Sequence, residues 1–166
     1  RSLSINVRNS NLGKLTRSYL YHSKALQSGA VLPVLTLLSK EGKNIRLKPR
    51  EGNKLTLIDF WYSHCSPCIG QFPDLKQFYA KYHPKGFEII SISTDKKNEL
   101  HLWHSTVDKY QLPWPQYIDI NAVACPELGI NVFPSNFIVD DKGKIISKDV
   151  TMVQLQNFLE EYFQDK

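Results

Sequence analysis

The first half of the chain carries short apolar runs separated by polar turns. Val34–Leu38 and Ile45–Leu47 flank the polar triplet Glu41-Gly42-Lys43, a pattern that predicts a β-hairpin. The next run, Leu55–Trp61, is almost continuously apolar and has the length of a strand, so we expect it to be buried on both faces of a sheet. Its single acid, Asp59, is out of place in such a strand.

A helical periodicity follows that strand. The apolar positions that recur at helical spacing are Phe72, Leu75, Phe78, Tyr79 and Tyr82. They predict an amphipathic helix from Cys68 through Tyr82 that packs on the sheet and is kinked by Pro73. Gly86 then opens a second apolar strand, Phe87–Ser93, and a second helical stripe comprises Leu100, Trp103, Val107 and Tyr110. The order strand, helix, strand predicts parallel pairing through a right-handed crossover.

The second half continues the same alternation of elements. A short strand is expected at 116–120, a helical turn at 121–128, and a hairpin whose strands are 136–139 and 144–147. The segment 151–154, Thr-Met-Val-Gln, has the pattern of a capping box that begins a final helix. We therefore predict one α/β domain over residues 29–166. Residues 1–28 are polar, with a short helical stretch around 15–26, and we expect them to be an extension or linker.

Composition excludes several classes of protein. With 166 residues, 42% apolar and 22% charged, the chain can bury one hydrophobic core. The net charge of +5 comes from scattered lysines and arginines, which does not favour nucleic-acid binding. No run reaches the roughly 18 apolar residues of a membrane span. The chain begins at Arg1 without an initiator Met, so we expect a trimmed piece whose missing signal peptide says nothing about compartment.

Two of the three cysteines form the motif Cys65-Ser66-Pro67-Cys68 at the predicted junction of strand and helix. Backbone N–H groups at a helix N-terminus stabilise a thiolate and can lower a cysteine pKa to roughly 3.5–7.5. We therefore expect Cys65 to be the attacking sulfur, and Cys68, more buried, to resolve the mixed disulfide. Pro67 suits an early helical position because its missing N–H needs no partner there.

Other uses of the cysteines are less well supported by the pattern. A zinc site needs a second Cys/His pair, and Cys125 and the pair His101/His104 lack a compact ligand spacing. Covalent haem attachment needs a His where Ile69 stands. We predict no metal and no cofactor, and we interpret Cys125 as a small packed residue.

The segment Asp59-Phe60-Trp61-Tyr62-Ser63-His64-Cys65-Ser66-Pro67-Cys68 resembles the active-site segment of thioredoxins. The likeness is greatest to the TlpA/ResA-like branch of the thioredoxin superfamily and covers roughly residues 29–166. It includes the N-terminal hairpin, Pro73 after the motif, and a helix and strand inserted before Phe133-Pro134-Ser135. The resemblance implies a thioredoxin-like fold, in which a central mixed sheet is flanked by helices.

The resemblance also implies roles for individual residues. Pro134 matches the cis-proline that faces the cysteines and offers backbone groups to a substrate. Phe133 would shape that groove, which Trp61, His64 and Pro67 would also border.

Asp59 matches the buried acid that moves protons to and from the resolving cysteine. Burial among apolar residues should raise the pKa of this carboxyl, which suits acid–base work, although a strand acid satisfied within the fold is the alternative.

Two positions depart from the family pattern. His64 stands where a tryptophan normally precedes the first cysteine, and Gln71 stands where an acidic residue often follows the second. Both departures bear on how the pKa values of the cysteines are tuned. His64, when protonated, would favour the Cys65 thiolate, or it is simply a loop residue facing solvent.

Taken together, these features predict a thiol–disulfide oxidoreductase that exchanges, and is expected to reduce, disulfides in protein partners. The resemblance implies a location outside the cytoplasm, in the periplasm or tethered to a membrane facing it, and an upstream electron donor. Two alternatives remain: a peroxiredoxin-like antioxidant, and a non-catalytic module that delivers metal or cysteines. The peroxiredoxin pattern needs Thr or Ser where Tyr62 stands.

Overall fold

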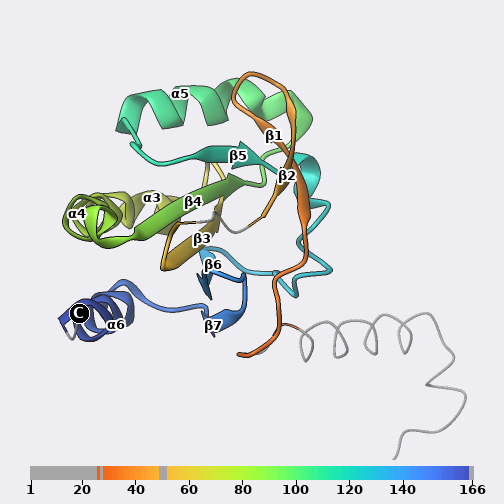
Figure 1. Ribbon diagram of the computed structural model, residues 1–166. Helices are drawn as coiled ribbons and strands as arrows, with labels where there is room; N and C mark the ends of the chain where they lie inside the picture. The colour runs from red at the N-terminus through yellow and green to blue at the C-terminus, as the bar shows by residue number, and fades with distance from the viewer. Residues whose placement is uncertain (1–25, 27, 49–51, 165–166) are drawn as a thin grey trace, which may run out of the picture.

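The computed structural model describes residue 26, residues 28–48 and residues 52–164. The helical stretch expected around 15–26 lies outside the described residues except for its last position, Leu26, which is in a turn. The described chain begins with three successive strands, continues with helices between strands, and ends in a strand pair and a helix, as Figure 1 shows. In order the elements are β1 (Leu35–Ser39), β2 (Asn44–Leu47), β3 (Leu55–Trp61), α3 (Ser66–Gly70), α4 (Phe72–Tyr82), η1 (His83–Lys85), β4 (Phe87–Ser93), η2 (Lys97–Glu99), α5 (Leu100–Tyr110), β5 (Gln116–Ile118), η3 (Ile120–Ala122), β6 (Ser135–Asp140), β7 (Ile145–Lys148) and α6 (Met152–Gln164).

All seven strands form one mixed sheet in the order β2-β1-β5-β4-β3-β6-β7. The central strands β3, β4 and β5 are parallel, as the strand–helix–strand order predicts. The hairpins β1–β2 and β6–β7 are antiparallel and occupy the two edges, and α5 with β5 forms the insertion that precedes β6. These features confirm the predicted thioredoxin-like fold class.

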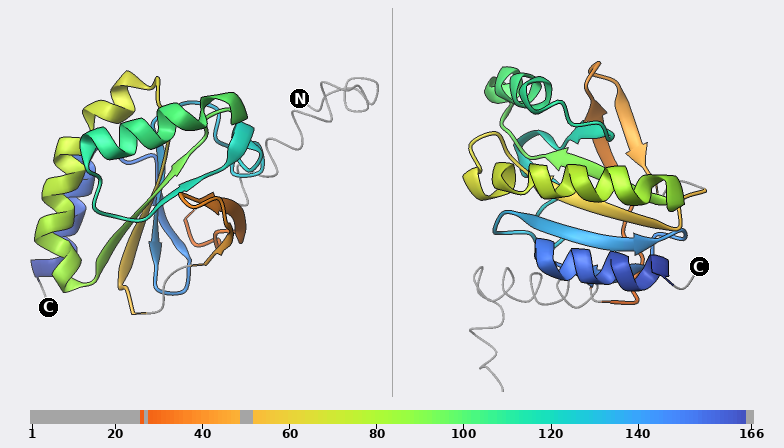
Figure 2. Two further views of the ribbon diagram at one scale, coloured as in Figure 1. Left: turned by 90° about the horizontal axis from the view of Figure 1, so that it is seen from above. Right: turned by 90° about the vertical axis from the view of Figure 1, so that its left-hand side faces the viewer.

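Two apolar clusters lie on opposite faces of the sheet. The side chains of a strand alternate between faces, so Leu57 and Trp61 enter the first cluster whereas Ile58 and Phe60 enter the second. The first cluster also takes the buried sides of α4, α5 and α6, and Figure 2 shows α4 and α6 side by side over one face of the sheet. All seven residues of β3 are buried, as expected of a central strand covered on both faces.

The helix expected from Cys68 to Tyr82 is in fact two helices. It begins two residues earlier, at Ser66, and is interrupted at Gln71, which separates α3 from α4. Pro73 explains the interruption because it has no N–H to donate and its ring crowds the carbonyl of Ile69, four residues earlier. The Gln71 N–H instead donates to the Cys68 carbonyl at 3.0 Å, a tighter turn that ends α3.

Helix α6 begins with the predicted capping box. The Thr151 hydroxyl accepts from the Gln154 N–H at 3.2 Å, and the Gln154 side chain accepts from the Thr151 N–H at 2.9 Å. Between β5 and β6, the helical turn expected at 121–128 is shorter, and regular structure there is limited to η3. Among the described residues no helix is long and apolar enough to cross a membrane.

Candidate active site

The cysteine motif lies where β3 gives way to α3. Cys65 is the N-cap of α3, and its Sγ accepts a hydrogen bond from the Cys68 N–H at 3.2 Å. The two cysteines are joined by a disulfide bond, with their Cα atoms 5.3 Å apart. Pro67 is in the first turn of α3, where its missing N–H costs nothing. The strand–helix junction therefore holds the pair close enough to open and close a disulfide.

Both cysteines are almost completely covered in this disulfide state. Each is 2% exposed, so the expectation that Cys68 would be the more buried of the two is wrong for the oxidised form. Both sulfur-bearing residues belong to the first apolar cluster, against which Tyr62 and Phe133 also pack. Within the motif, only the intervening Ser66 and Pro67 are exposed. The motif therefore reaches solvent through its two middle residues.

A buried carboxylate holds the loop that leads into the motif. Asp95, 2% exposed, accepts from the Ser63 N–H at 3.0 Å and from the Ser63 hydroxyl at 2.8 Å. The Ser93 hydroxyl donates to the same carboxylate at 2.6 Å, and the Thr94 N–H donates to the Trp61 carbonyl at 2.8 Å. This anchor was not predicted. Its only sequence signal is an acid shortly after the buried strand β4.

Asp59 lies on the face of the sheet that carries the cysteines. Side chains two positions apart in a strand point to the same face, so Asp59 faces the same side as Leu57 and Trp61, both members of the first cluster. Its side chain is buried, and the residue is 3% exposed. Burial raises the pKa of this carboxyl to about 7, and a hydrogen bond from Ser91 opposes part of that rise. At neutral pH the group can therefore both take up and release a proton, which is what a proton carrier needs.

The segment before β6 lies beside the motif loop. The Phe133–Pro134 peptide bond is cis, as the resemblance implied, and Ser135 pairs with Phe60 near the end of β3. The ring of Phe133 meets the ring of Tyr62 edge to face, with centroids 5.3 Å apart. Phe133 and Pro134 are both half-buried. The pairing of β6 with β3 thus brings these two residues to the loop that carries Cys65.

Trp61 and His64 occupy unlike positions. Trp61 is fully buried and packs edge to face on Phe72 with ring centroids 5.2 Å apart, so the expectation that it borders a substrate groove is wrong. It is the last residue of a strand covered on both faces, which leaves it no route to the surface. His64 is exposed, and its Nε2 lies 4.0 Å from the Glu99 carboxylate, a neighbour the sequence did not indicate.

The expectations about a metal site and about Cys125 concern residues outside the cysteine motif. Within the described ranges no group of three or more His, Cys, Asp or Glu side chains is placed to hold a metal ion. Cys125 is a buried free thiol in the second cluster, on the opposite face from Cys65 and Cys68.

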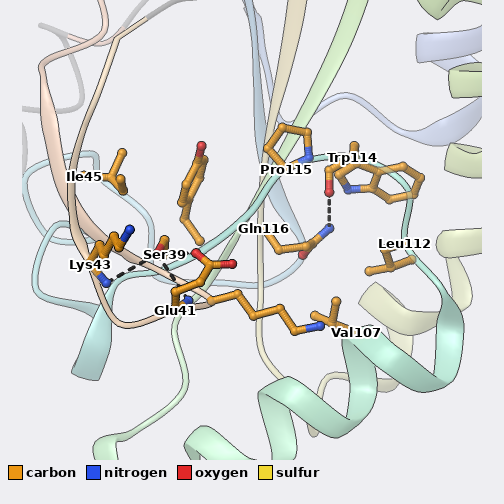
Figure 3. A pocket seen from close by; sticks show the side chains of 11 residues that line it. Ser39, Glu41, Lys43, Ile45, Val107, Leu112, Trp114, Pro115 and Gln116 are labelled. Carbon is orange, nitrogen blue, oxygen red and sulfur yellow. Dashed lines mark hydrogen bonds between the residues drawn. The ribbon is translucent and has the colours of Figure 1, made fainter.

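A surface cavity of about 420 Å³ lies between the β1–β2 hairpin, α5 and β5 (Figure 3). None of its lining residues belongs to the cysteine loop.

Comparison with known proteins gives consistent likenesses. The family model described as the AhpC/TSA family matches residues 28–148. The chain is 30% identical over 149 residues to the thiol-disulfide oxidoreductase ResA of a Bacillus cereus strain, and the match covers 88% of this chain and 84% of that protein.

Solved structures agree. The thioredoxin domain of a thiol-disulfide oxidoreductase from Bacteroides vulgatus has a TM-score of 0.73 and 31% identity, over 82% of this chain and 98% of that one. A thiol:disulfide interchange protein from Bacteroides sp. has a TM-score of 0.73 and 29% identity, over 84% and 92% of the two chains.

Proposed function

Because the chain belongs to the AhpC/TSA family and is a thioredoxin-like thiol–disulfide oxidoreductase, we propose that it reduces disulfides in protein partners outside the cytoplasm. The observation that carries the proposal is the Cys65–Cys68 disulfide at the junction of β3 and α3, on the same face as a buried acid. A reduced cysteine pair that can form such a disulfide can pass two electrons to the disulfide of another protein.

The proposed cycle starts from the reduced pair. The Cys65 thiolate attacks one sulfur of the partner's disulfide, so that bond breaks, a mixed disulfide forms, and the partner's other sulfur leaves as a thiolate. Cys68 then loses its proton to Asp59 and attacks Cys65 Sγ. The Cys65–Cys68 disulfide forms and the partner's second thiolate is released. The partner has gained two electrons, and an upstream electron donor must return two to the cysteines.

The partner would lie against the residues that border the disulfide. His64 and Pro67 are exposed beside the cysteines, and Phe133 and Pro134 are half-buried next to the motif loop. In the proposed complex, backbone groups at Pro134 bind an extended segment of the partner while Phe133 shapes the groove. His64 would favour the Cys65 thiolate when its imidazole is protonated.

The direction of electron flow and the location come from the resemblance to the TlpA/ResA-like branch. Its members generally reduce particular cysteine pairs outside the cytoplasm, and the relatives named thiol-disulfide oxidoreductase ResA support the general activity from which this proposal starts. In this proposal residues 29–166 are the catalytic domain, and residues 1–28 link it to a membrane anchor or an upstream domain.

The test is an equilibrium titration of the cysteine pair against glutathione, combined with insulin reduction. We expect a potential nearer the roughly −270 mV of thioredoxin than the roughly −120 mV of strongly oxidising dithiol proteins. Cys65→Ser should abolish insulin reduction, Cys68→Ser should accumulate mixed disulfides, and Cys125→Ser, a matched control, should behave as wild type. A potential close to that of the oxidants would reverse the proposed direction, and full activity in Cys65→Ser would refute the mechanism.

A further inference from the structure

A chain of two hydrogen bonds leads to Asp59 from a distant part of the sequence. The Trp114 indole N–H donates to the Ser91 hydroxyl at 2.8 Å, and the Ser91 hydroxyl donates to Asp59 Oδ2 at 3.0 Å. Exposures of 3%, 0% and 3% for Trp114, Ser91 and Asp59 show that all three are shielded from solvent. In a site this dry, each of these bonds is electrostatically stronger than it would be in water.

The chemistry of the three groups fixes the direction of both bonds while Asp59 is ionised. An indole nitrogen can only donate, so the Ser91 oxygen must be the acceptor from Trp114. The Ser91 hydroxyl has one proton and two lone pairs. An ionised Asp59 can only accept, so that proton points to Oδ2, and the Trp114 donation to one lone pair favours the same orientation when Asp59 is neutral. Among the described residues, the hydrogen bond found at this carboxyl is the one to Oδ2, so Oδ2 and not Oδ1 is the oxygen that Ser91 occupies. With Ser91 held in this orientation, a proton taken up by Asp59 goes to Oδ1.

We propose that Ser91 and Trp114 are positioning residues for proton transfer by Asp59, because they hold Oδ2 as an acceptor and leave Oδ1 to carry the exchangeable proton. This inference rests on the proposed function, in which Asp59 takes the proton of Cys68. Neither positioning residue is expected to contact the partner protein.

The backbone keeps the two positioning residues in place. Ser91 is the parallel-register partner of Asp59, so β3 and β4 set the distance between them. The Ser91 N–H donates to the Pro115 carbonyl at 3.1 Å, which fixes the segment carrying Trp114 beside β4. The Trp114 ring also packs against Tyr79, with centroids 5.6 Å apart, and borders the surface cavity (Figure 3).

No charged neighbour competes with this arrangement in the region described. The raised pKa of Asp59 has two causes, burial and the opposing hydrogen bond from Ser91. On β6 the facing residue is Asn136, whose amide bonds to the backbone of Val150. The titratable side chains that the helices and the motif bring to the same cluster are Tyr62, Tyr79, Tyr82, Tyr110, Tyr162 and, after reduction, Cys65 and Cys68.

The two positioning residues affect the Asp59 pKa in the same direction for different reasons. Ser91→Ala removes a donor to the carboxylate, so the charged form is disfavoured and the pKa rises, by about one pH unit. Trp114→Phe removes the donor that orients the Ser91 hydroxyl, so this hydroxyl turns more readily to accept a hydrogen bond from neutral Asp59. The neutral form gains, and the pKa rises again although Trp114 does not touch the carboxyl.

The experiment follows the Asp59 carboxyl directly in the oxidised full chain, by pH titration of its infrared or ¹³C NMR signal. Ser91→Ala and Trp114→Phe should both raise the midpoint, and Ser91→Thr, which keeps the hydroxyl, should restore it. The double variant should match Ser91→Ala alone, because Trp114 acts only through Ser91. Trp103→Phe is the matched control, since Trp103 is buried in the same cluster and its indole nitrogen has no hydrogen-bond partner among the described residues.

Unchanged midpoints in Ser91→Ala and Trp114→Phe would overturn the inference whatever the activity of the protein. An equal rise in Trp103→Phe would also overturn it, since the effect would then be one of packing. If the midpoints move as expected and the pH profile of insulin reduction does not follow, the positioning stands and the proposed role of Asp59 in the reaction fails.

Discussion

At the scale of single residues, burial disfavours the charged form of Asp59. Its carboxyl is buried in an apolar cluster, and burial raises its pKa to about 7 from an ordinary value near 3.8. In the unfolded chain the same group loses its proton at about pH 4. The native state therefore holds a proton that the unfolded state has released, throughout the range between these two pH values.

This difference predicts a pH-dependent stability. The native state binds more protons than the unfolded state between about pH 4 and pH 7, so the free energy of unfolding of the oxidised protein should fall as pH rises through that window. The loss should be on the order of 4 kcal/mol. Chemical denaturation at pH 4, 5.5, 7 and 8 measures it, and Asp59→Asn should remove that part of the slope. Parallel profiles for the two proteins would contradict the assigned pKa.

The sequence indicates the residues of the site that follow a local pattern, and misses those that depend on long-range contacts. Cys65, Cys68 and Asp59 stand out because of their spacing or because an acid interrupts an apolar strand. Ser91 and Asp95 do not, since each acts on residues 32 positions away through the pairing of β3 with β4. Trp61 was misplaced for the opposite reason: its position next to the motif says nothing about which way its ring points.

At the scale of elements, the β3–α3 loop depends on a carboxylate from another strand end. Asp95 takes both hydrogen bonds that Ser63 offers and one from Ser93, so it determines where the loop begins its turn toward Cys65. A loop held by buried, charge-assisted hydrogen bonds is a rigid support for a reactive group.

Removing this anchor should weaken both fold and catalysis. Asp95→Ala leaves the Ser63 N–H and the Ser93 hydroxyl without their acceptor, and we expect a loss of about 2–3 kcal/mol in the free energy of unfolding together with slower insulin reduction. Asp141→Ala, at an exposed turn position, is the control and should change neither quantity appreciably. Wild-type stability in Asp95→Ala would show that the loop is held by other contacts.

Element types were predictable from apolar periodicity, whereas the ends of elements were not. The apolar stripe in α4 predicts a helix, and the continuous apolar run in β3 predicts a buried strand. The helix breaks at Gln71 because the ring of Pro73 prevents it from continuing unbroken. The apolar periodicity is the same on both sides of the break and so does not predict it. The start of α3 at Ser66 likewise depends on Cys65 acting as the cap.

At the scale of the whole molecule, the sheet separates two cysteine environments. The sequence could not place Cys125 relative to the motif, because the order of the strands decides which face each segment covers. In the structure it lies in the second cluster, 3% exposed, and burial, together with the nearby Asp119, raises the pKa of its thiol to about 12. The thiolate needed for exchange is therefore suppressed at this position.

The separation predicts how many thiols react. Treated with a disulfide reagent at pH 8, the reduced native protein should yield two equivalents quickly, from Cys65 and Cys68, and a third only after denaturation. If the third equivalent is missing in denatured Cys125→Ala, it comes from Cys125. Three equivalents from the native protein at one rate would show that the second cluster opens readily.

The two edges of the sheet have a consequence for solubility. Both outer strands, β2 and β7, are only four residues long, and β2 presents the exposed Arg46. The start of β7 is covered by residues 29–31, through bonds from the Gly29 N–H to the Ile145 carbonyl and from the Ile145 N–H to the Ala30 carbonyl. Short, charged or covered edges are poor templates for another chain, so aggregation by edge-to-edge strand addition is disfavoured even at high protein concentration.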